Sequence, residues 1–399
     1  MVSALTYRDF RLVWTGAFLS TIGTWMQQVA QSWLMLTLAG ASSAFYLGLD
    51  SFLGQAPILL LTLVGGVVAD RLDRRHVLMG SQVIQMSTAL TLTALVYTGH
   101  IRIWHVLTLS IITGVAQAFG GPAHHSLMPS LVDKEHLPNA IAFNAIQFNL
   151  ARVIGPLLAG AALTAFGMVA CFGLNGLSFL AVIVALLMLR ARPPLTATGR
   201  SLKDEMKSGF AYVRSTPSMV GLATLGFMGT FLGSPLLTFL PLFAKDVLGG
   251  DVAQYTHLMS WAGAGAVVGA MGVAWLGKFQ HMGRAVLGLQ VALGTVIVLF
   301  ANTRLPLANA LLLFAGGACM VMVFATLQSL VQLRAPNELR GRVMSIYMMA
   351  FRGGMPLGSL AGGWLANQFT APPVLTMNGA ALALIAAWFL IKGHGVKEL

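Results

Sequence analysis

Three ionisable side chains, Asp50, Arg152 and Arg352, lie inside long apolar segments of the sequence. A charge inside a bilayer costs enough free energy that each is a candidate functional residue. Asp50 could carry a proton, contact a cation, or reach water from near the bilayer surface. Each arginine could contact a solute, or bind helix-end carbonyls and neighbouring amides and so hold the structure together.

Uncharged polar side chains recur on the same segments. The first apolar segment carries a set of them at spacings of three and four, and such a set is expected to face away from lipid. These are Ser20, Thr24, Gln27, Gln28 and Gln31. Further candidates are Gln117, Asn144, Gln147, Thr326 and Gln328. Two interpretations stay open: lining of a water-accessible cavity for a solute, or hydrogen bonding between helices.

The segments that must position these residues are predicted to be transmembrane helices. The chain has 399 residues, of which 57% are hydrophobic and 9% charged, and its mean hydropathy is +0.78. A soluble domain carries about 25% charged residues, so this surface is expected to face lipid. Apolar runs of about 20 residues recur and period-2 alternation is absent, which predicts spanning helices and excludes a β-barrel.

Apolar runs bounded by charged residues, Gly or Pro predict twelve helices. The first six cover 14–38, 44–68, 77–98, 104–121, 138–164 and 168–189, and the second six cover 218–244, 254–277, 284–301, 305–330, 340–368 and 372–391. The first run, about 25 residues long, exceeds the apolar core of a signal peptide and is expected to stay as a helix.

Positive charge predicts the orientation of these helices. Of the 24 Lys and Arg residues, only Arg102, Lys245 and Arg304 fall in loops on the side away from the termini, and Arg152 and Arg352 lie within helices. Because Lys and Arg concentrate on the cytoplasmic side, both termini are predicted to be cytoplasmic. The same distribution explains the net charge of +12 without a nucleic-acid partner, since the basic residues form no stripe on a soluble face.

An internal repeat relates the two halves. Residues 152–157 match 352–357 at Arg, Pro and Leu with a shift of 200 residues, and Asn175-Gly176 matches Asn378-Gly379 with a shift of 203. Asp70-Arg71 falls opposite Gly277-Lys278 with a shift of 207. Two parallel six-helix repeats are a transporter architecture, with the solute site expected near the midplane between them.

The longest loop gives the domain boundaries. We expect residues 1–190 to form an N-terminal six-helix bundle, 191–217 a cytoplasmic linker, and 218–399 a C-terminal six-helix bundle. Within the linker, Leu202, Met206, Phe210 and Val213 recur at helical spacing after Ser201. This spacing predicts a helix that lies at the membrane surface.

A charged motif closes the second helix: Gly66-Val-Val-Ala-Asp70-Arg71-Leu-Asp73-Arg74-Arg75. An Asp at a helix C-terminus opposes the helix dipole, so Asp70 is expected to need a compensating Arg or the N-terminus of another helix. Such a contact could hold one conformation shut and make the motif a gate. A solvated loop with a positive cluster would account for Arg71, Arg74 and Arg75 but not for Asp70.

At this motif the chain resembles the major facilitator superfamily, whose pattern is Gly-x-x-x-Asp-Arg-x-Gly-Arg-Arg. Asp73 replaces the second Gly, and the segment from Gly277 to Arg284 is similar to the degenerate second-half copy. The segments from Phe10 to Gln27 and from Leu137 to Pro156 look like the enterobactin-exporter and multidrug-efflux branch. The resemblance implies the twelve-helix fold and export of a small organic molecule.

A helix-bending motif strengthens the resemblance. Gly155-Pro156-Leu-Leu-Ala-Gly160 is similar to the exporter motif of the family, in which Gly permits close helix approach and Pro bends the span. Pro356 repeats its proline in the second half. The family's helix-4 motif, an Arg four residues before a Gly, is missing, since Ser110 stands four residues before Gly114. That departure weighs against the usual proton-antiport mechanism.

Other classes of chemistry lack their motifs. Walker A, catalytic-triad and zinc spacings are absent, so neither an enzyme nor an ATP-driven pump is predicted, and no metal or cofactor is expected. Cys171 and Cys319 lie in apolar runs and are expected to pack in the interior. His124-His125 is expected to be a cytoplasmic loop pair.

The sequence therefore predicts an all-α, twelve-helix secondary transporter of a bacterial inner membrane. We expect export of a drug-like amphiphile or siderophore-like metabolite by alternating access, with the proton gradient as driving force, Asp50 or Asp70 as coupling carboxylate, and a monomeric state. One alternative is a lysophospholipid or lipid transporter of the same fold. Another is a non-transporting membrane receptor or scaffold, which the short linker and tails disfavour.

Overall fold

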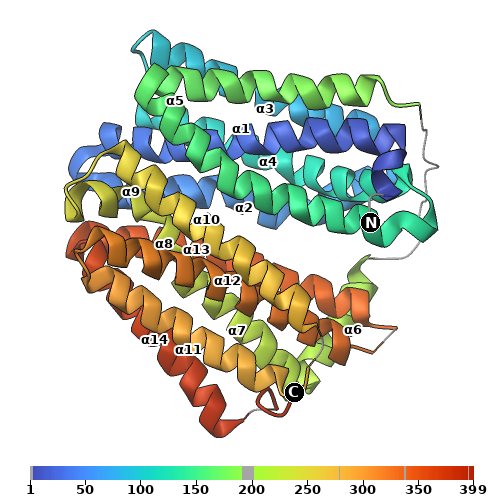
Figure 1. Cartoon of the computed structure of the whole chain (residues 1–399). Helices are drawn as coiled ribbons and strands as arrows, with labels where there is room; N and C mark the ends of the chain where they lie inside the picture. Colours follow the sequence, from blue (N-terminus) through green and yellow to red (C-terminus); the bar gives the residue numbers. More distant parts are fainter. Residues whose placement is uncertain (1–2, 191–201, 278, 337, 394) are drawn as a thin grey trace. The chain divides into compact units, whose positions relative to one another are not determined.

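The computed structural model describes residues 3–190, 202–277, 279–336, 338–393 and 395–399. Helices form almost all of the described chain (Figure 1). The first half contains α1 (Arg8–Ala39), α2 (Ser43–Arg71), α3 (Arg74–Tyr97), α4 (Ile103–Leu127) and α5 (Leu137–Leu187). The second half contains α6 (Leu202–Ser215), α7 (Pro217–Gly233), α10 (Val252–Leu276), α11 (Met282–Asn302), α12 (Pro306–Arg334), α13 (Arg340–Phe369) and α14 (Ala371–Lys392).

The predicted twelve long helices are all present in the described residues. α5 counts as two, because Gly167 interrupts it with φ 75° and ψ −176°, a conformation open to Gly because it has no Cβ. Among the described residues, eight stretches are long and apolar enough to span a membrane. Two of them, Arg8–Thr62 and Lys134–Leu187, each contain two helices. The helices α3 and α13 are less apolar and are not among the eight stretches.

The predicted helix over 218–244 is broken. α7 ends at Gly233, and the chain continues as the short α8 (Pro235–Thr238), α9 (Leu240–Leu242) and a π-helical turn, Phe243–Val247. Pro235 is the first residue of α8 and Pro241 the second residue of α9, and neither can donate the backbone hydrogen bond of a continuous helix. Hydropathy did not reveal the break, since the residues around both prolines are apolar.

The expectation of a loop pair at His124-His125 was wrong. α4 runs on to Leu127 and contains both histidines. Ala123 and Leu127 are fully buried beside Phe10 and Ala140, and this packing extends the helix beyond the apolar run that defined its predicted end.

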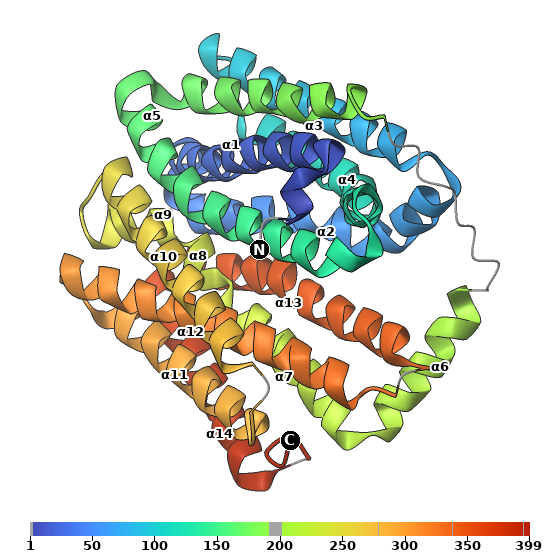
Figure 2. The same cartoon turned by 45° about the vertical axis from the view of Figure 1, so that its right-hand side comes forward.

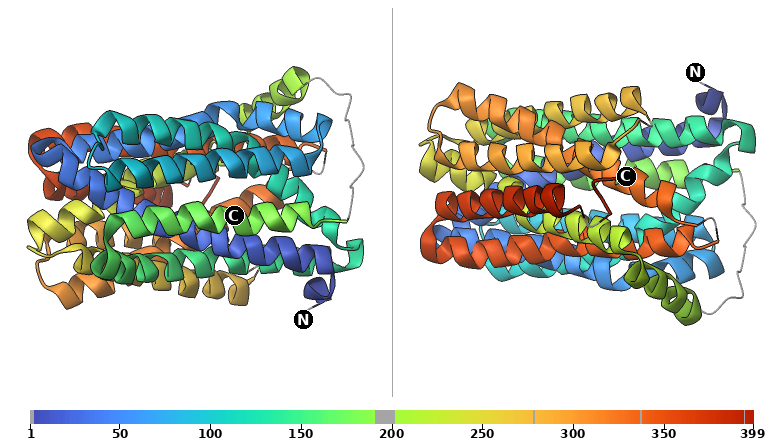
Figure 3. Two further views of the ribbon diagram at one scale, coloured as in Figure 1. Left: turned by 90° about the horizontal axis from the view of Figure 1, so that it is seen from above. Right: turned by 90° about the horizontal axis from the view of Figure 1, so that it is seen from below.

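The chain forms two compact units, one of Met1–Gly40 with Leu53–Thr198 and one of Ala41–Phe52 with Gly199–Leu399. In the first unit α1 packs on α5, and α3 packs on both α4 and α5. In the second unit α10 packs on α12, α11 on α14, and α7 on α13 (Figures 1 and 2). The long helices of each unit run roughly parallel to one another (Figure 3).

The repeat seen in the sequence has a counterpart in packing. A Cβ added at Gly176 would lie 2.7 Å from Leu90 Cδ2, where α5 meets α3. A Cβ added at Gly379 would lie 2.6 Å from the Gly294 carbonyl oxygen and 3.0 Å from Ile297 Cβ, where α14 meets α11. The two repeated Asn-Gly pairs thus mark the same close helix approach, one in each unit.

Candidate transport site

The polar side chains of α1 bond to neighbouring helices in the first unit. Asn175 Nδ2 donates to Gln27 Oε1 at 2.6 Å, and Gln31 Nε2 donates to Ser110 Oγ at 2.9 Å. Thr24 Oγ1 donates to the Ser20 carbonyl within its own helix at 2.9 Å. Gln27 and Gln31 thus hydrogen-bond between helices, the alternative that the sequence left open, whereas the Thr24 bond stays within α1.

Gln28 differs from its neighbours on α1. Its side chain is exposed and has no hydrogen-bond partner among the described residues. An amide exposed within an apolar helix is costly in lipid, so Gln28 is the member of the α1 set that most needs water or a ligand.

Gln117 belongs to a chain of buried polar groups between α3 and α4. Its Nε2 donates to Gln85 Oε1 at 3.2 Å, Gln85 Nε2 donates to Ser81 Oγ at 3.1 Å, and Ser81 Oγ donates to the Ala116 carbonyl at 2.7 Å. Sequence analysis did not single out Ser81 or Gln85, although their spacing of four on one helix was a usable signal.

Gln147 and Arg152 face α1 from the first half of α5. Gln147 is 4% exposed, and its Nε2 donates to Thr21 Oγ1 at 3.2 Å while its Oε1 has no partner. The Arg152 guanidinium lies over the Trp25 ring, 5.7 Å from the centroid. A cation over an indole face is attracted by the ring quadrupole, so Trp25 holds this charge within the apolar segment.

The helix-bending motif lies at the same crossing. A Cβ at Gly155 would collide with Trp25 Cβ and lie 3.1 Å from the Ile22 carbonyl oxygen. Pro156 and Gly160 are buried beside it. Gly155 therefore permits the close approach of α5 to α1, as the resemblance implied.

The equivalent crossing in the second unit joins α7 to α13. Thr230 Oγ1 donates to the Phe351 carbonyl at 2.8 Å, and Ser234 Oγ lies 3.3 Å from the Met355 carbonyl. Cβ atoms at Gly354 and Gly358 would meet the backbone of α7. Pro356 is buried in this seam, whereas Arg352 is exposed and has no hydrogen bond or ion pair to the described residues.

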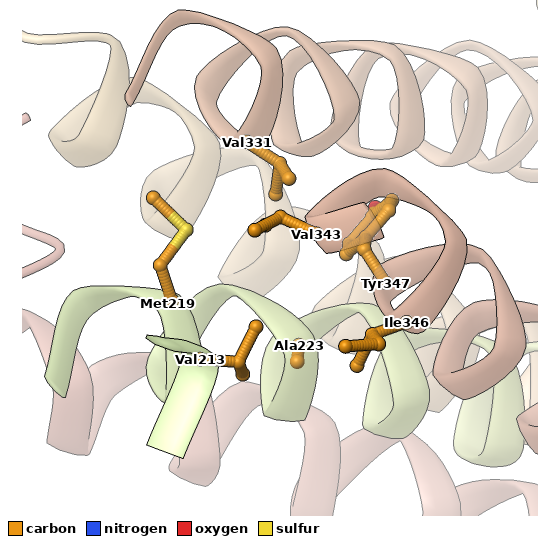
Figure 4. A pocket seen from close by; sticks show the side chains of 7 residues that line it. All are labelled: Val213, Met219, Ala223, Val331, Val343, Ile346 and Tyr347. Atoms are coloured by element: carbon orange, nitrogen blue, oxygen red, sulfur yellow. The ribbon is translucent and has the colours of Figure 1, made fainter. Parts of the chain in front are cut away.

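Tyr347 was missed by sequence analysis. It is 3% exposed, its hydroxyl has no partner, and its ring fills the space beside Gly226, where an added Cβ would lie 2.8 Å from Tyr347 Cε2. It also lines a small apolar pocket with Val213, Met219, Ala223, Val331, Val343 and Ile346 (Figure 4). The shift of 200 residues aligns Tyr347 with Gln147. The residues next to both positions are apolar, so the sequence does not draw attention to this match.

The remaining predicted lining residues lie apart from these contacts. Asn144 hydrogen-bonds the His124 ring, between α5 and α4. Gln328 is partly buried on α12 and has no hydrogen-bond partner among the described side chains, while Thr326 is buried.

The charged motif ends α2 and begins α3. Arg75 Nη2 donates to the Leu187 carbonyl at 3.0 Å, and Arg74 Nε lies 3.4 Å from the Ala69 carbonyl. Asp73 caps α3 by accepting from Arg75 N at 2.9 Å. The residue that departs from the family pattern thus starts the next helix. Arg71 is exposed, and the side chain of Asp70 lies outside the described set.

The glycine of this motif is open. No described atom lies within 4 Å of a Cβ added at Gly66, whereas one at Gly65 would collide with the Ala118 carbonyl of α4. Gly65 therefore makes the close approach between α2 and α4 that glycine permits.

Asp50 lies on the part of α2 that packs within the second unit. A Cβ at Gly48 would meet the Ser359 carbonyl oxygen of α13, and one at Gly363 would lie 2.7 Å from the Ala44 carbonyl oxygen. Asp50 is partly buried two residues after this contact.

Long apolar helices that carry buried amides and a guanidinium define a polytopic membrane protein. A family model described as a transmembrane secretion effector matches residues 2–398. The chain belongs to this family, within the major facilitator superfamily, and it is not an enzyme.

Relatives and solved structures extend this assignment. The chain is 22% identical to macrolide efflux protein A of Streptococcus pyogenes over 385 residues, 94% of each chain. It is 26% identical to the enterobactin exporter EntS of Escherichia coli, covering 97% of this chain and 92% of that one. A crystal structure of a bacterial homologue of the human lysosomal transporter Spinster superposes with a TM-score of 0.77, at 13% identity over 97% of both chains.

Proposed function

We propose that this efflux transporter exports a drug-like amphiphile or a siderophore-like metabolite, driven by the proton gradient. The observation that carries the proposal is the set of amide and guanidinium groups held inside apolar helices, above all Gln147, Arg152 and the exposed Gln28. Such groups are costly in lipid unless they serve a polar pathway. The relatives that act on a macrolide and on enterobactin support this substrate range.

Alternating access would use the two repeats as its moving parts. We propose residues 1–190 and 218–399 as the bundles and 191–217 as the linker, in a monomer with both termini in the cytoplasm of a bacterium. The helix Leu202–Ser215 within the linker, with Val213 buried and Phe210 60% exposed, supports its assignment as an interfacial helix.

The charged motif would act as the gate. Gly66, Asp70, Arg71, Arg74 and Arg75 close α2 and open α3, and Arg75 already ties this corner to the end of α5. We propose that Asp70 stabilises one conformation and that Asp50 is the carboxylate that couples proton entry to solute movement. One charge moved across 100 mV yields about 2.3 kcal/mol, which corresponds to a roughly 50-fold concentration ratio of one uncharged solute.

The test is uptake into inverted membrane vesicles that hold the full chain. Ethidium and a catecholate siderophore would be offered separately, with and without an imposed pH gradient. Gradient-dependent accumulation of either one supports export, and accumulation of neither by folded, correctly oriented protein contradicts the proposed substrates.

Two variants separate the carboxylates in the same vesicles. Asp50→Asn is expected to remove the dependence on the pH gradient. Asp70→Asn is expected to slow transport at every gradient without loss of expression. An unaltered pH profile removes Asp50 from the coupling step, and unchanged rates for Asp70→Asn refute the gate.

A further inference from the structure

A cavity in the second unit lies outside all the contacts described above. It opens between the first turns of α10 and α12 and has a volume of about 280 Å³. Gln254, His257 and Trp261 line it from α10, and Pro306 and Ala310 line it from α12. The three α10 residues are spaced by three and four, so they share one face of the helix over about 10 Å of its length.

The polar groups of this cavity are available to a ligand. Neither the Gln254 carboxamide nor the His257 imidazole has a side-chain hydrogen bond or ion pair with the described residues. The Gln254 side chain turns back over Gly250, where an added Cβ would collide with its Oε1. Gln254 is partly buried and His257 is exposed. Within an apolar helix, a carboxamide and an imidazole are costly in lipid without a partner, so an occupant that hydrogen-bonds is favoured over a lipid chain that cannot.

The aromatic wall is fixed in orientation. Trp261 is 39% exposed and packs edge-on against Phe314, with ring centroids 6.2 Å apart and planes inclined at 77°. The exposed surface of an indole held in this way can pack against a flat ring of a ligand. Aromatic pairs prefer offset-stacked or edge-to-face contacts.

We propose that this cavity is a subsite for the planar aromatic part of the exported molecule, with Gln254 and His257 bonding its polar substituents. The inference rests on the proposed export function and specifies its substrate class. A cavity of about 150 Å³ holds one benzene ring, so 280 Å³ accommodates a fused ring system. Apolar walls with a few convergent polar groups are the usual composition of a small-molecule site.

The internal repeat supports the assignment independently. The shift of 207 residues that sets Asp70 opposite Gly277 also sets Asp50 opposite His257. Both repeats thus carry an ionisable side chain about two turns from the start of the equivalent helix. In the first half it is a carboxylate, and in the second half an imidazole beside an indole, which suits binding of an aromatic solute.

The test is equilibrium binding of ethidium to the purified full-length chain in detergent, read by fluorescence. Trp261→Leu is expected to raise Kd at least fivefold, because it removes the ring surface, and Trp261→Phe is expected to restore most of the affinity. The double variant Gln254→Leu, His257→Leu is expected to raise Kd by a similar factor. Trp275→Leu is the matched control, since Trp275 is 86% exposed on the same helix and lies outside the cavity.

Decyltrimethylammonium, which has a chain and no ring, serves as the competitor. If decyltrimethylammonium fails to displace ethidium, the proposal is supported. If it displaces ethidium and its own affinity is unchanged by Trp261→Leu, the cavity is a lipid groove and the proposal is overturned. Absence of saturable ethidium binding, or equal Kd for Trp261→Leu and Trp275→Leu, also overturns it. Binding needs no gradient, so a chain that binds ethidium at Trp261 but accumulates nothing in vesicles would contradict the export function and leave the subsite standing.

Discussion

The crossing of α1 with α5 and the crossing of α7 with α13 are repeats of one another, but they are joined differently. At the first, Gln147 Nε2 donates to the Thr21 hydroxyl and Trp14 Nε1 donates to the Phe143 carbonyl at 2.9 Å. At the second, the Thr230 hydroxyl donates to the Phe351 carbonyl, and the Tyr347 ring fills the space beside Gly226. The same duplicated geometry thus pairs an amide with a hydroxyl in one unit and packs a tyrosine ring against a glycine in the other.

The largest expected effect is at the glycine seam of the second unit. Gly358→Leu would drive its Cβ into the Phe231 carbonyl, and such overpacking against backbone is expected to cost about 3 kcal/mol. The melting midpoint in detergent measures the loss. Gly288→Ala is the control, because nothing lies within 4 Å of its Cβ. Equal midpoints for the two variants would mean that the seam is not rigid.

A second pair of variants tests the glycines at the end of α2. Gly65→Ala is expected to destabilise by about 2 kcal/mol because its Cβ meets the Ala118 carbonyl. Gly66→Ala is expected to leave the melting midpoint unchanged, although the family pattern marks Gly66. A larger loss of stability for Gly66→Ala than for Gly65→Ala would show that Gly66, the glycine of the motif, makes the close helix contact.

The two crossings should respond with opposite signs to the loss of one hydroxyl each. Thr21→Val removes the acceptor of Gln147 Nε2 and leaves a buried carboxamide unpaired, which is expected to cost about 1–2 kcal/mol. Tyr347→Phe removes a buried hydroxyl that has no partner, so stability should stay equal or rise by up to about 1 kcal/mol. Chemical denaturation in mixed micelles measures both. A marked loss for Tyr347→Phe would reveal a partner for this hydroxyl.

The smallest effect is expected outside the helices of either crossing. Tyr7 donates to Asp133 Oδ2 at 2.6 Å, and this hydrogen bond to the carboxylate raises the pKa of Tyr7 above its usual 10. The raised pKa means that this bond stabilises the fold at neutral pH and is lost as the pH rises through the tyrosine range. Tyr7→Phe should therefore lower the melting midpoint slightly at pH 7, and this difference should vanish as the pH rises beyond the raised pKa of Tyr7. A gap that persists at high pH would point to packing as the cause.

The predictions from sequence succeeded where one physical property decides the outcome. Hydropathy alone placed the twelve helices, because a segment in lipid must satisfy its own backbone hydrogen bonds. It failed at Pro235 and Pro241, which break the seventh helix within an apolar run. It also ended the fourth helix too early, since burial of Leu127 extends that helix to include His124.

The candidate site was only partly visible in the sequence. Composition identified the amides of α1 and the arginine Arg152 as costly in lipid, but it left their partners open. Their partners Asn175, Ser110 and Trp25 lie on other helices, 79 to 148 residues away along the chain. Spacing within one helix says nothing about such contacts.

The sequence by itself determined the medium, the number of helices, the repeat and the family, because each follows from local composition or from matches along the chain. Tertiary structure alone decided which polar atoms are paired, that Gly65 makes the close approach, and that Asp50 packs within the second unit. The reason is that pairing and burial are set where helices cross, and a crossing joins residues that no sequence interval relates.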